Sequence, residues 1–304
     1  MREVVGSSPT VSTTTPRSTV LLRGIFLFTE VKMQVSTVNI SELYGLQGSA
    51  TLECITHDTY RDDFALPARP SVIVVPGGGY AMVSKREGEP IASYYLAKGY
   101  NTFILTYSVA PISYPTQLLQ LSATVDYLHA NAETLHVDEN AIFIVGFSAG
   151  GHLVANFATD YMNVNAKFGK EWKLGATAVC LSYPVITSVL SYKDTQTNLL
   201  SAYSGAEHEA LMKELNLDER VTAQTLPSFV WTTAQDNCVP PQNSLMYTSA
   251  CLEHGVRCEL HMFPDGWHGL STCDEQTNDG DQPFFAKNHN WLALSEDFFR
   301  TCIK

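Results

Sequence analysis

Short apolar runs alternate along this chain with longer segments whose apolar positions recur at helical spacing. Residues 71–75 read Ser-Val-Ile-Val-Val, a continuous apolar run of the kind found in strands that are covered on both faces. Residues 116–130 instead repeat apolar side chains every three or four positions, which predicts an amphipathic helix. Further strands are predicted at 102–107, 141–145, 178–181, 228–231 and 258–263, and further helices at 89–98, 151–161, 242–254 and 291–299.

Strands that alternate with helices at this spacing predict an α/β fold with a mostly parallel, doubly wound sheet and helices on both of its faces. The alternation breaks in one place. Residues 192–204 are polar and rich in tyrosine, and residues 207–215 predict a single short helix. We therefore expect a small cap insertion at about 185–226.

The first 32 residues differ from the rest of the chain. Residues 6–19 are rich in Ser, Thr and Pro, a composition that cannot bury a core face. Residues 21–28 are apolar, but Arg23 interrupts them and the run is too short to span a bilayer. We expect 1–32 to be a disordered extension, with a weak interfacial anchor as the alternative, and 33–304 to form one domain.

The composition of the chain limits which molecules it can bind and where it is expected to be located. The net charge is −12, and the 19 basic residues form no cluster, which argues against nucleic acid and anionic membranes as partners. The apolar fraction of 45% is that of a globular protein with a full-sized core. Seven scattered cysteines, an odd number, favour reduced thiols and hence a cytoplasmic location. The oligomeric state is not indicated.

One group of residues superficially resembles a zinc site: Cys251, His254, Cys258 and His261. Cys258 and His261 fall in a predicted strand, where an odd separation points them to opposite faces of the sheet. No tight second pair of ligands follows them. We therefore predict neither a metal nor a cofactor.

The motif Gly-x-Ser-x-Gly occurs at residues 146–150, directly after an apolar run and directly before an apolar helical segment. A sharp turn between a strand and a helix is the context in which this motif exposes a nucleophilic serine. A glycine-rich turn without chemical function is the alternative. The context favours Ser148 as a nucleophile.

A serine hydroxyl needs a base, and the base needs an acid that orients it. His268 lies in a glycine-flanked loop after the last predicted strand, where the active sites of α/β proteins form. It is preferred over His152, which lies on the helix after Ser148 and is expected to brace the turn. Asp236 follows the strand at 228–231 and precedes His268, which makes it the predicted acid in preference to Asp265.

Acyl transfer also needs backbone donors for the oxyanion that forms on the substrate. The residue after the nucleophile, Ala149, supplies one N–H. The others are expected from the loop after the strand at 71–75, where Gly78 and Gly79 lie in the run Pro-Gly-Gly-Gly-Tyr. A phosphate-binding loop is excluded, because no Gly-Lys-Ser/Thr follows these glycines.

These motifs carry a resemblance. From about residue 50 onward the chain resembles the α/β-hydrolase superfamily, in the branch of small microbial acetyl-esterase and carbohydrate-esterase-like proteins. The resemblance is carried by the segments 76–80, 84–90, 146–152, 235–241 and 268–270. Relatives of the hormone-sensitive-lipase type begin the glycine loop with histidine, where this chain has Pro76, and that difference argues against bulky lipid substrates.

The resemblance and the motifs together predict a serine carboxylic ester hydrolase with Ser148, His268 and Asp236 as its triad. The expected substrate is a small ester with an acetyl or other short acyl group, such as an acetylated oligosaccharide. Tyr80 and Trp267 are predicted to contact it, with Tyr192 and Tyr203 of the cap as further candidates. An amidase, arylformamidase or small peptidase of the same fold and a non-catalytic ligand-binding homologue are the alternatives.

Overall fold

A single large sheet runs through the part of the chain that can be described. The computed structural model describes residues 33–58, 60–61, 64–190, 193–278 and 286–303. All of them belong to the second of two units, Val31–Lys304. The predicted disordered extension at 1–32 and the candidate cap residue Tyr192 lie outside the described residues.

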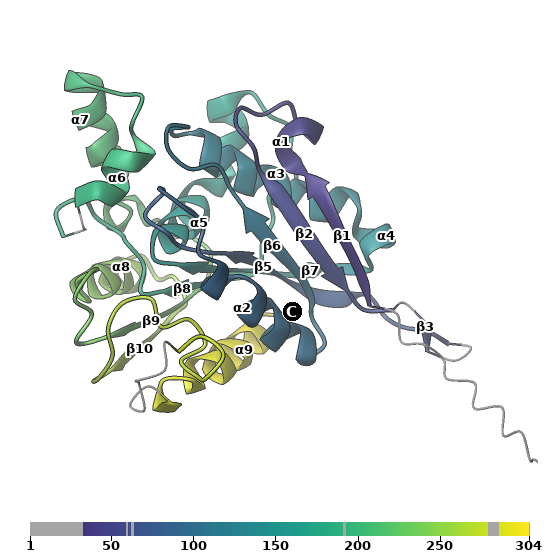
Figure 1. The fold of residues 1–304 in the computed structure, drawn as a ribbon. Helices are drawn as coiled ribbons and strands as arrows, with labels where there is room; N and C mark the ends of the chain where they lie inside the picture. Colours follow the sequence, from purple (N-terminus) through teal and green to yellow (C-terminus); the bar gives the residue numbers. More distant parts are fainter. Residues whose placement is uncertain (1–32, 59, 62–63, 191–192, 279–285, 304) are drawn as a thin grey trace, which may run out of the picture. The chain divides into compact units, whose positions relative to one another are not determined.

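The sheet of the described residues has eight strands in the order β1–β2–β6–β5–β7–β8–β9–β10 (Figure 1). The six strands from β6 to β10 pair in parallel, so the predicted mostly parallel sheet is confirmed. The strands are β1 (Gln34–Asn39), β2 (Thr51–Thr56), β5 (Arg69–Val75), β6 (Asn101–Thr106), β7 (Val137–Phe147), β8 (Ala178–Ser182), β9 (Ser228–Thr233) and β10 (Cys258–Phe263). Two short strands, β3 (Tyr60–Arg61) and β4 (Phe64–Ala65), form a separate antiparallel pair.

Two antiparallel strands extend the sheet beyond the predicted set. β1 pairs with β2, and β2 pairs with β6, both antiparallel. The pattern of apolar positions gave no sign of β1, because five of its six residues are exposed and its sequence is correspondingly polar.

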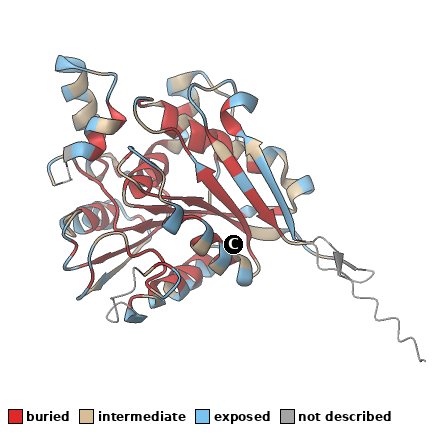
Figure 2. Ribbon diagram, in the orientation of Figure 1, coloured by how far each residue is buried: buried red, intermediate tan, exposed pale blue. Residues whose placement is uncertain are grey.

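Alternate residues of the central strands enter two separate cores, because successive side chains of a strand point to opposite faces. Ile73 of β5 and Ile144 of β7 lie in one core with the apolar faces of three helices, α3 (Thr116–Ala130), α5 (Ala149–Phe168) and α8 (Gln242–Glu253). Val72 and Phe143 lie in the other core, with α2 (Glu89–Ala97) and α9 (Asn290–Cys302). Figure 2 shows these central strands buried over most of their length, except near their amino ends. Helices therefore cover both faces, which confirms the doubly wound arrangement.

Helices α2, α3, α8 and α9 agree with the predicted ones to within a few residues. Helix α5 has 20 residues where 11 were predicted, so it is about two and a half turns longer than expected. The bounds are α1 (Ile40–Leu43), α2 (Glu89–Ala97), α3 (Thr116–Ala130), α4 (Ala132–Leu135), α5 (Ala149–Phe168), α8 (Gln242–Glu253) and α9 (Asn290–Cys302), with the 3-10 turns η1 (Lys85–Glu87) and η2 (Asp218–Arg220). The short helices α1 and α4 were not predicted. Stacking of Trp231 on Trp291, with ring centroids 4.9 Å apart, fastens α9 to the sheet.

The segment between β8 and β9 carries two helices, where the sequence predicted one. The predicted helix is present as α7 (Gly205–Glu214), and a second helix, α6 (Lys193–Leu199), precedes it. Hydropathy missed α6 because two of its buried residues, Thr195 and Gln196, are polar. The end of the segment is bonded to its beginning, because the Leu217 N–H donates to the carbonyl of Ile186.

Among the described residues, no helix is both long enough and apolar enough to cross a bilayer. The cytoplasmic location that the cysteine content suggests stays a prediction.

Candidate active site

Ser148 occupies a strained turn between β7 and α5. Its φ of 53° and ψ of −116° lie outside the regions that ordinary residues prefer. The turn is tight because the first turn of α5 presses against the end of β5. A side-chain carbon at Gly150 would lie 2.2 Å from the carbonyl oxygen of Val75, so only glycine fits there. The predicted turn geometry around the serine is therefore present.

Three predicted residues form one hydrogen-bonded chain. The Nε2 atom of His268 lies 2.7 Å from Oγ of Ser148, and its Nδ1 atom lies 2.8 Å from Oδ2 of Asp236. An ionised carboxylate can only accept, so Nδ1 carries the proton. Nε2 then has a free lone pair directed at the hydroxyl of Ser148, which is the arrangement that a general base requires.

Asp236 is held in place by its own loop. Its side chain is 1% exposed, and Oδ1 accepts the backbone N–H groups of Cys238 and Val239 at 2.9 and 2.8 Å. These bonds leave Oδ2 directed at His268. Asp265, the weaker candidate, instead accepts from the side chain of Gln235 at 3.3 Å.

The glycine loop after β5 lies beside the nucleophile, since a side-chain carbon at Gly77 would lie 2.9 Å from Cβ of Ser148. Gly78 and Gly79 have φ values of 123° and 61°, which favour glycine. In the described part of the chain, neither these two residues nor Ala149 donates its backbone N–H to a protein acceptor. Three predicted oxyanion donors are thus unused by the protein itself.

A buried carboxylate that the sequence analysis missed supports this loop. Glu87 is 4% exposed; its Oε2 accepts the Gly77 N–H at 2.8 Å and its Oε1 accepts the hydroxyl of Tyr183 at 2.7 Å. The ring of Tyr183 meets the His268 ring edge-on, with centroids 5.0 Å apart. One acid therefore connects the glycine loop with the aromatic support of the base. The only signal in the sequence is its place in the segment 84–90.

The structure corrects the predicted place of Tyr80. Its ring is 1% exposed and packs against Tyr107 and His152, so it offers no accessible face to a substrate. Trp267 is 44% exposed in the loop that carries His268, and its contact with substrate stays a prediction. Tyr203 packs against the core and donates its hydroxyl to the carbonyl of Tyr114.

The segment between β8 and β9, which the sequence analysis predicts to be a cap, reaches the glycine loop through α6. The side-chain amide of Asn198 donates to the carbonyl of Gly79 at 2.9 Å. At the start of the insertion, the Val185 N–H donates to the carbonyl of Ser148 at 3.2 Å. The insertion is therefore bonded to both elements that surround the predicted oxyanion site.

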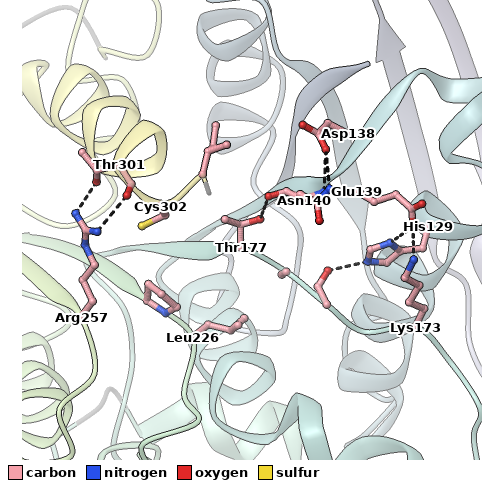
Figure 3. Close-up of a pocket in the computed structure, with 14 residues that line it drawn as sticks. His129, Asp138, Glu139, Asn140, Lys173, Thr177, Leu226, Arg257, Thr301 and Cys302 are labelled. Atoms are coloured by element: carbon pink, nitrogen blue, oxygen red, sulfur yellow. Dashed lines mark hydrogen bonds and ion pairs between the residues drawn. The ribbon is translucent and has the colours of Figure 1, made fainter. Parts of the chain in front are cut away.

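A cavity of about 850 Å³ lies away from this site, at the amino ends of β8, β9 and β10 (Figure 3). Its charged side chains already have partners: Glu139 binds Lys173 and His129, and Arg257 donates to Thr301. The residues of the predicted triad follow the carboxyl ends of β7, β9 and β10, which is the side of such sheets where ligands bind. The candidate site and this cavity thus lie at opposite ends of the strands.

No cluster of three or more metal-binding side chains is found within the described ranges. Of the four residues weighed as a zinc site, His261 instead binds Glu259 through Nε2 at 2.7 Å.

Comparison with known proteins assigns the family. The family model described as BD-FAE matches residues 58–250, well over half of the chain. The chain belongs to the BD-FAE family. This BD-FAE protein has the α/β-hydrolase fold: it superimposes with a TM-score of 0.77 on the carboxylesterase Cest-2923 from Lactobacillus plantarum WCFS1. That match has 28% identity and covers 90% of this chain and 99% of the other.

Two relatives extend the comparison of the BD-FAE protein. It is 31% identical over 215 residues to endo-1,4-beta-xylanase B from Butyrivibrio fibrisolvens, covering 68% of this chain and 33% of that protein. It is 26% identical over 242 residues to an acetylxylan esterase from Xylanibacter ruminicola, covering 77% of this chain and 45% of that protein. The chain therefore spans between a third and a half of the length of these relatives. The predicted esterase branch of the α/β hydrolases is confirmed.

Proposed function

We propose that this protein is a serine carboxylic ester hydrolase. The observation that carries the proposal is the hydrogen-bonded chain from Ser148 through His268 to Asp236. In this chain Ser148 is placed as a nucleophile, His268 as its base and Asp236 as the acid that orients the base. The structural similarity to a carboxylesterase and the sequence similarity to an acetylxylan esterase support an ester as the substrate.

In the proposed reaction, Oγ of Ser148 attacks the ester carbonyl carbon while Nε2 of His268 takes the hydroxyl proton. The bond between the carbonyl carbon and the alcohol oxygen then breaks as His268 returns the proton to the departing alcohol. Water, which gives a proton to Nε2 of His268, then attacks the carbonyl carbon of the acyl group. The bond between that carbon and Oγ of Ser148 breaks, His268 returns the proton to Oγ, and the carboxylic acid leaves. Only protons and the acyl group move, so the mechanism uses no cofactor.

The tetrahedral intermediates carry a negative oxygen, which the backbone N–H groups of Gly78, Gly79 and Ala149 would bind. Their lack of protein acceptors supports this role. A donor of this kind is worth about 3–4 kcal/mol in the transition state. Asp236, which keeps the proton on Nδ1 of His268, would also stabilise the imidazolium that forms during each attack.

The proposed substrate carries an acetyl or other short acyl group on a sugar or small alcohol. The name of the acetylxylan esterase relative supports the acetyl group. The contact of α6 with Gly79 supports a confined acyl site, because the cap lies directly against the glycine loop. The exposed indole of Trp267 supports a sugar ring, which stacks on flat aromatic faces.

The test combines labelling with a substrate series. A fluorophosphonate probe should label the wild-type protein and not Ser148→Ala, and the same variant should lose nearly all hydrolysis of p-nitrophenyl acetate. Wild-type protein that is neither labelled nor active would overturn the proposal in favour of a binding protein. Among p-nitrophenyl esters, acetate should exceed butyrate and octanoate, whereas a maximum at eight carbons refutes the short acyl site. Acetate release from acetylated xylooligosaccharides, compared with an aryl acetate, tests the sugar.

A further inference from the structure

Three elements that surround the candidate site meet at one buried histidine that the mechanism does not use. The hydroxyl of Tyr80, in the glycine loop, lies 3.0 Å from Nδ1 of His152. Nε2 of the same ring lies 3.3 Å from the carbonyl oxygen of Leu215, at the end of the cap helix α7. His152 itself is in the first turn of α5 and donates its backbone N–H to the carbonyl of Ser148. Tyr80, His152 and Leu215 are each at most 1% exposed.

The two contacts admit only one arrangement of protons. A carbonyl oxygen cannot donate, so the proton of the neutral ring must be on Nε2, which donates to Leu215. Nδ1 is then an acceptor, and the hydroxyl of Tyr80 donates to it. Burial, assisted by the charge of Arg220, lowers the pKa of His152 to about 4, which keeps the ring neutral. Both bonds therefore persist at neutral pH.

The hydrogen bond to His152 helps to keep Tyr80 in place, because the backbone of Tyr80 is strained. Its φ of 55° places a bulky residue in the left-handed region, at a cost that the surrounding contacts must meet. Tyr80 directly follows Gly79, so the peptide group that joins them is fixed from both sides. Asn198 donates to the Gly79 carbonyl, and Nδ1 of His152 accepts from the hydroxyl of Tyr80.

We propose that His152 is a positioning residue that, through the hydroxyl of Tyr80, sets the direction of the backbone donors in the glycine loop and ties that direction to the docked cap. The inference rests on the proposed ester hydrolysis, because it concerns the oxyanion that this reaction forms. It gives the buried Tyr80 a role in the transition state in place of the substrate contact expected from the sequence.

Isosteric variants provide the test. Tyr80→Phe keeps the ring and removes only the donor, and His152→Leu removes both bonds. His152→Gln retains one amide donor and one carbonyl acceptor. Tyr95→Phe is the matched control, because Tyr95 is also fully buried and loses one hydroxyl bond, to Ser295, in the opposite core. The measurements are kcat and KM for p-nitrophenyl acetate, the inhibition constant of a trifluoromethyl ketone and the melting temperature.

Tyr80→Phe should lower kcat about ten-fold with KM within two-fold, as for a lost hydrogen bond that matters only in the transition state. The ketone, which forms a tetrahedral oxyanion on the enzyme, should bind more weakly by the same factor. His152→Leu should lose more, and His152→Gln should recover part of it. Tyr95→Phe should lower only the melting temperature.

The inference is overturned if Tyr80→Phe and His152→Leu melt earlier but keep kcat and ketone affinity, as a purely structural role requires. It is also overturned if KM alone rises. Wild-type protein without esterase activity would instead contradict the proposed function, so the two failures are distinguishable. If His152→Leu does not fold, Tyr80→Phe and His152→Gln decide the matter.

Discussion

Replacement of His152 by glutamine should change how the stability of the protein depends on pH. Burial lowers the pKa of the His152 ring to about 4 in the folded chain, whereas an ordinary unfolded histidine titrates near 6.5. Below pH 6.5 the unfolded chain therefore binds a proton that the folded chain does not bind. Folding stability is thus fully present above about pH 6.5 and falls as the pH decreases toward 4.

The magnitude follows from the difference between the two pKa values. At 1.36 kcal/mol per pKa unit, a difference of about 2.5 units removes about 3 kcal/mol of stability once the pH reaches 4. At pH 4.5 most of that loss, about 2.5 kcal/mol, should already be present. Glutamine cannot titrate, so His152→Gln should lack this component.

The assay is urea unfolding of both proteins at pH 7 and pH 4.5. The stability of the wild type should fall by about 2.5 kcal/mol more than that of His152→Gln. Tyr80→Phe is the matched control, since it keeps the buried ring and should retain the steeper dependence of the wild type. Parallel losses in the wild type and His152→Gln would refute the argument, because His152 would then not be neutral by burial.

Three further predictions concern the geometry of the site. Asp236→Asn should fold but lose on the order of 10⁴-fold in kcat for p-nitrophenyl acetate, because the amide favours the wrong tautomer of His268, whereas Asp265→Asn should stay near wild type; the reverse result would move the acid to Asp265. Glu87→Gln replaces one of the two acceptor oxygens of Glu87 with a donor, opposite either Gly77 or Tyr183. The free energy of unfolding in urea should therefore fall by about 2–3 kcal/mol. An unchanged free energy of unfolding would contradict this role of Glu87. Gly150→Ala should lower the free energy of unfolding by about 3 kcal/mol or more, since no backbone atom near Val75 can yield, and a stable variant would show that the turn relaxes.

The elements with regular patterns could be predicted from the sequence. The helix predicted at 116–130 is α3 with the same bounds, because its apolar stripe packs directly on the core. Ser148, Asp236 and His268 could be chosen together because each follows a predicted strand, and parallel strands bring their carboxyl ends to one edge. The order of these residues along the chain was therefore enough to predict that they lie close together.

The remainder depends on contacts that no local pattern records. Helix α6 buries threonine and glutamine, so its hydropathy resembles that of a loop. Tyr80 was expected to contact the substrate because its aromatic ring lies beside the glycine loop, but the residue has a left-handed backbone and its ring is buried in the core. Glu87 gains its importance from Tyr183, 96 residues later in the chain, a pairing that only the fold creates.

His268 follows the last strand of the sheet, and this position gives the site two parts of unequal local stability. Ser148 follows β7, which has strands on both sides, whereas His268 follows β10, the last strand of the sheet, bonded to β9 alone. Edge elements with partly exposed side chains open more readily than central ones, and the residues of β10 are only half-buried or exposed. Fraying of β10 would withdraw His268, the proposed base, while Ser148, the proposed nucleophile, and its turn stay intact. The protein would then pass through folded but inactive molecules before it unfolds, so activity would report on one edge of the sheet while melting reports on its centre.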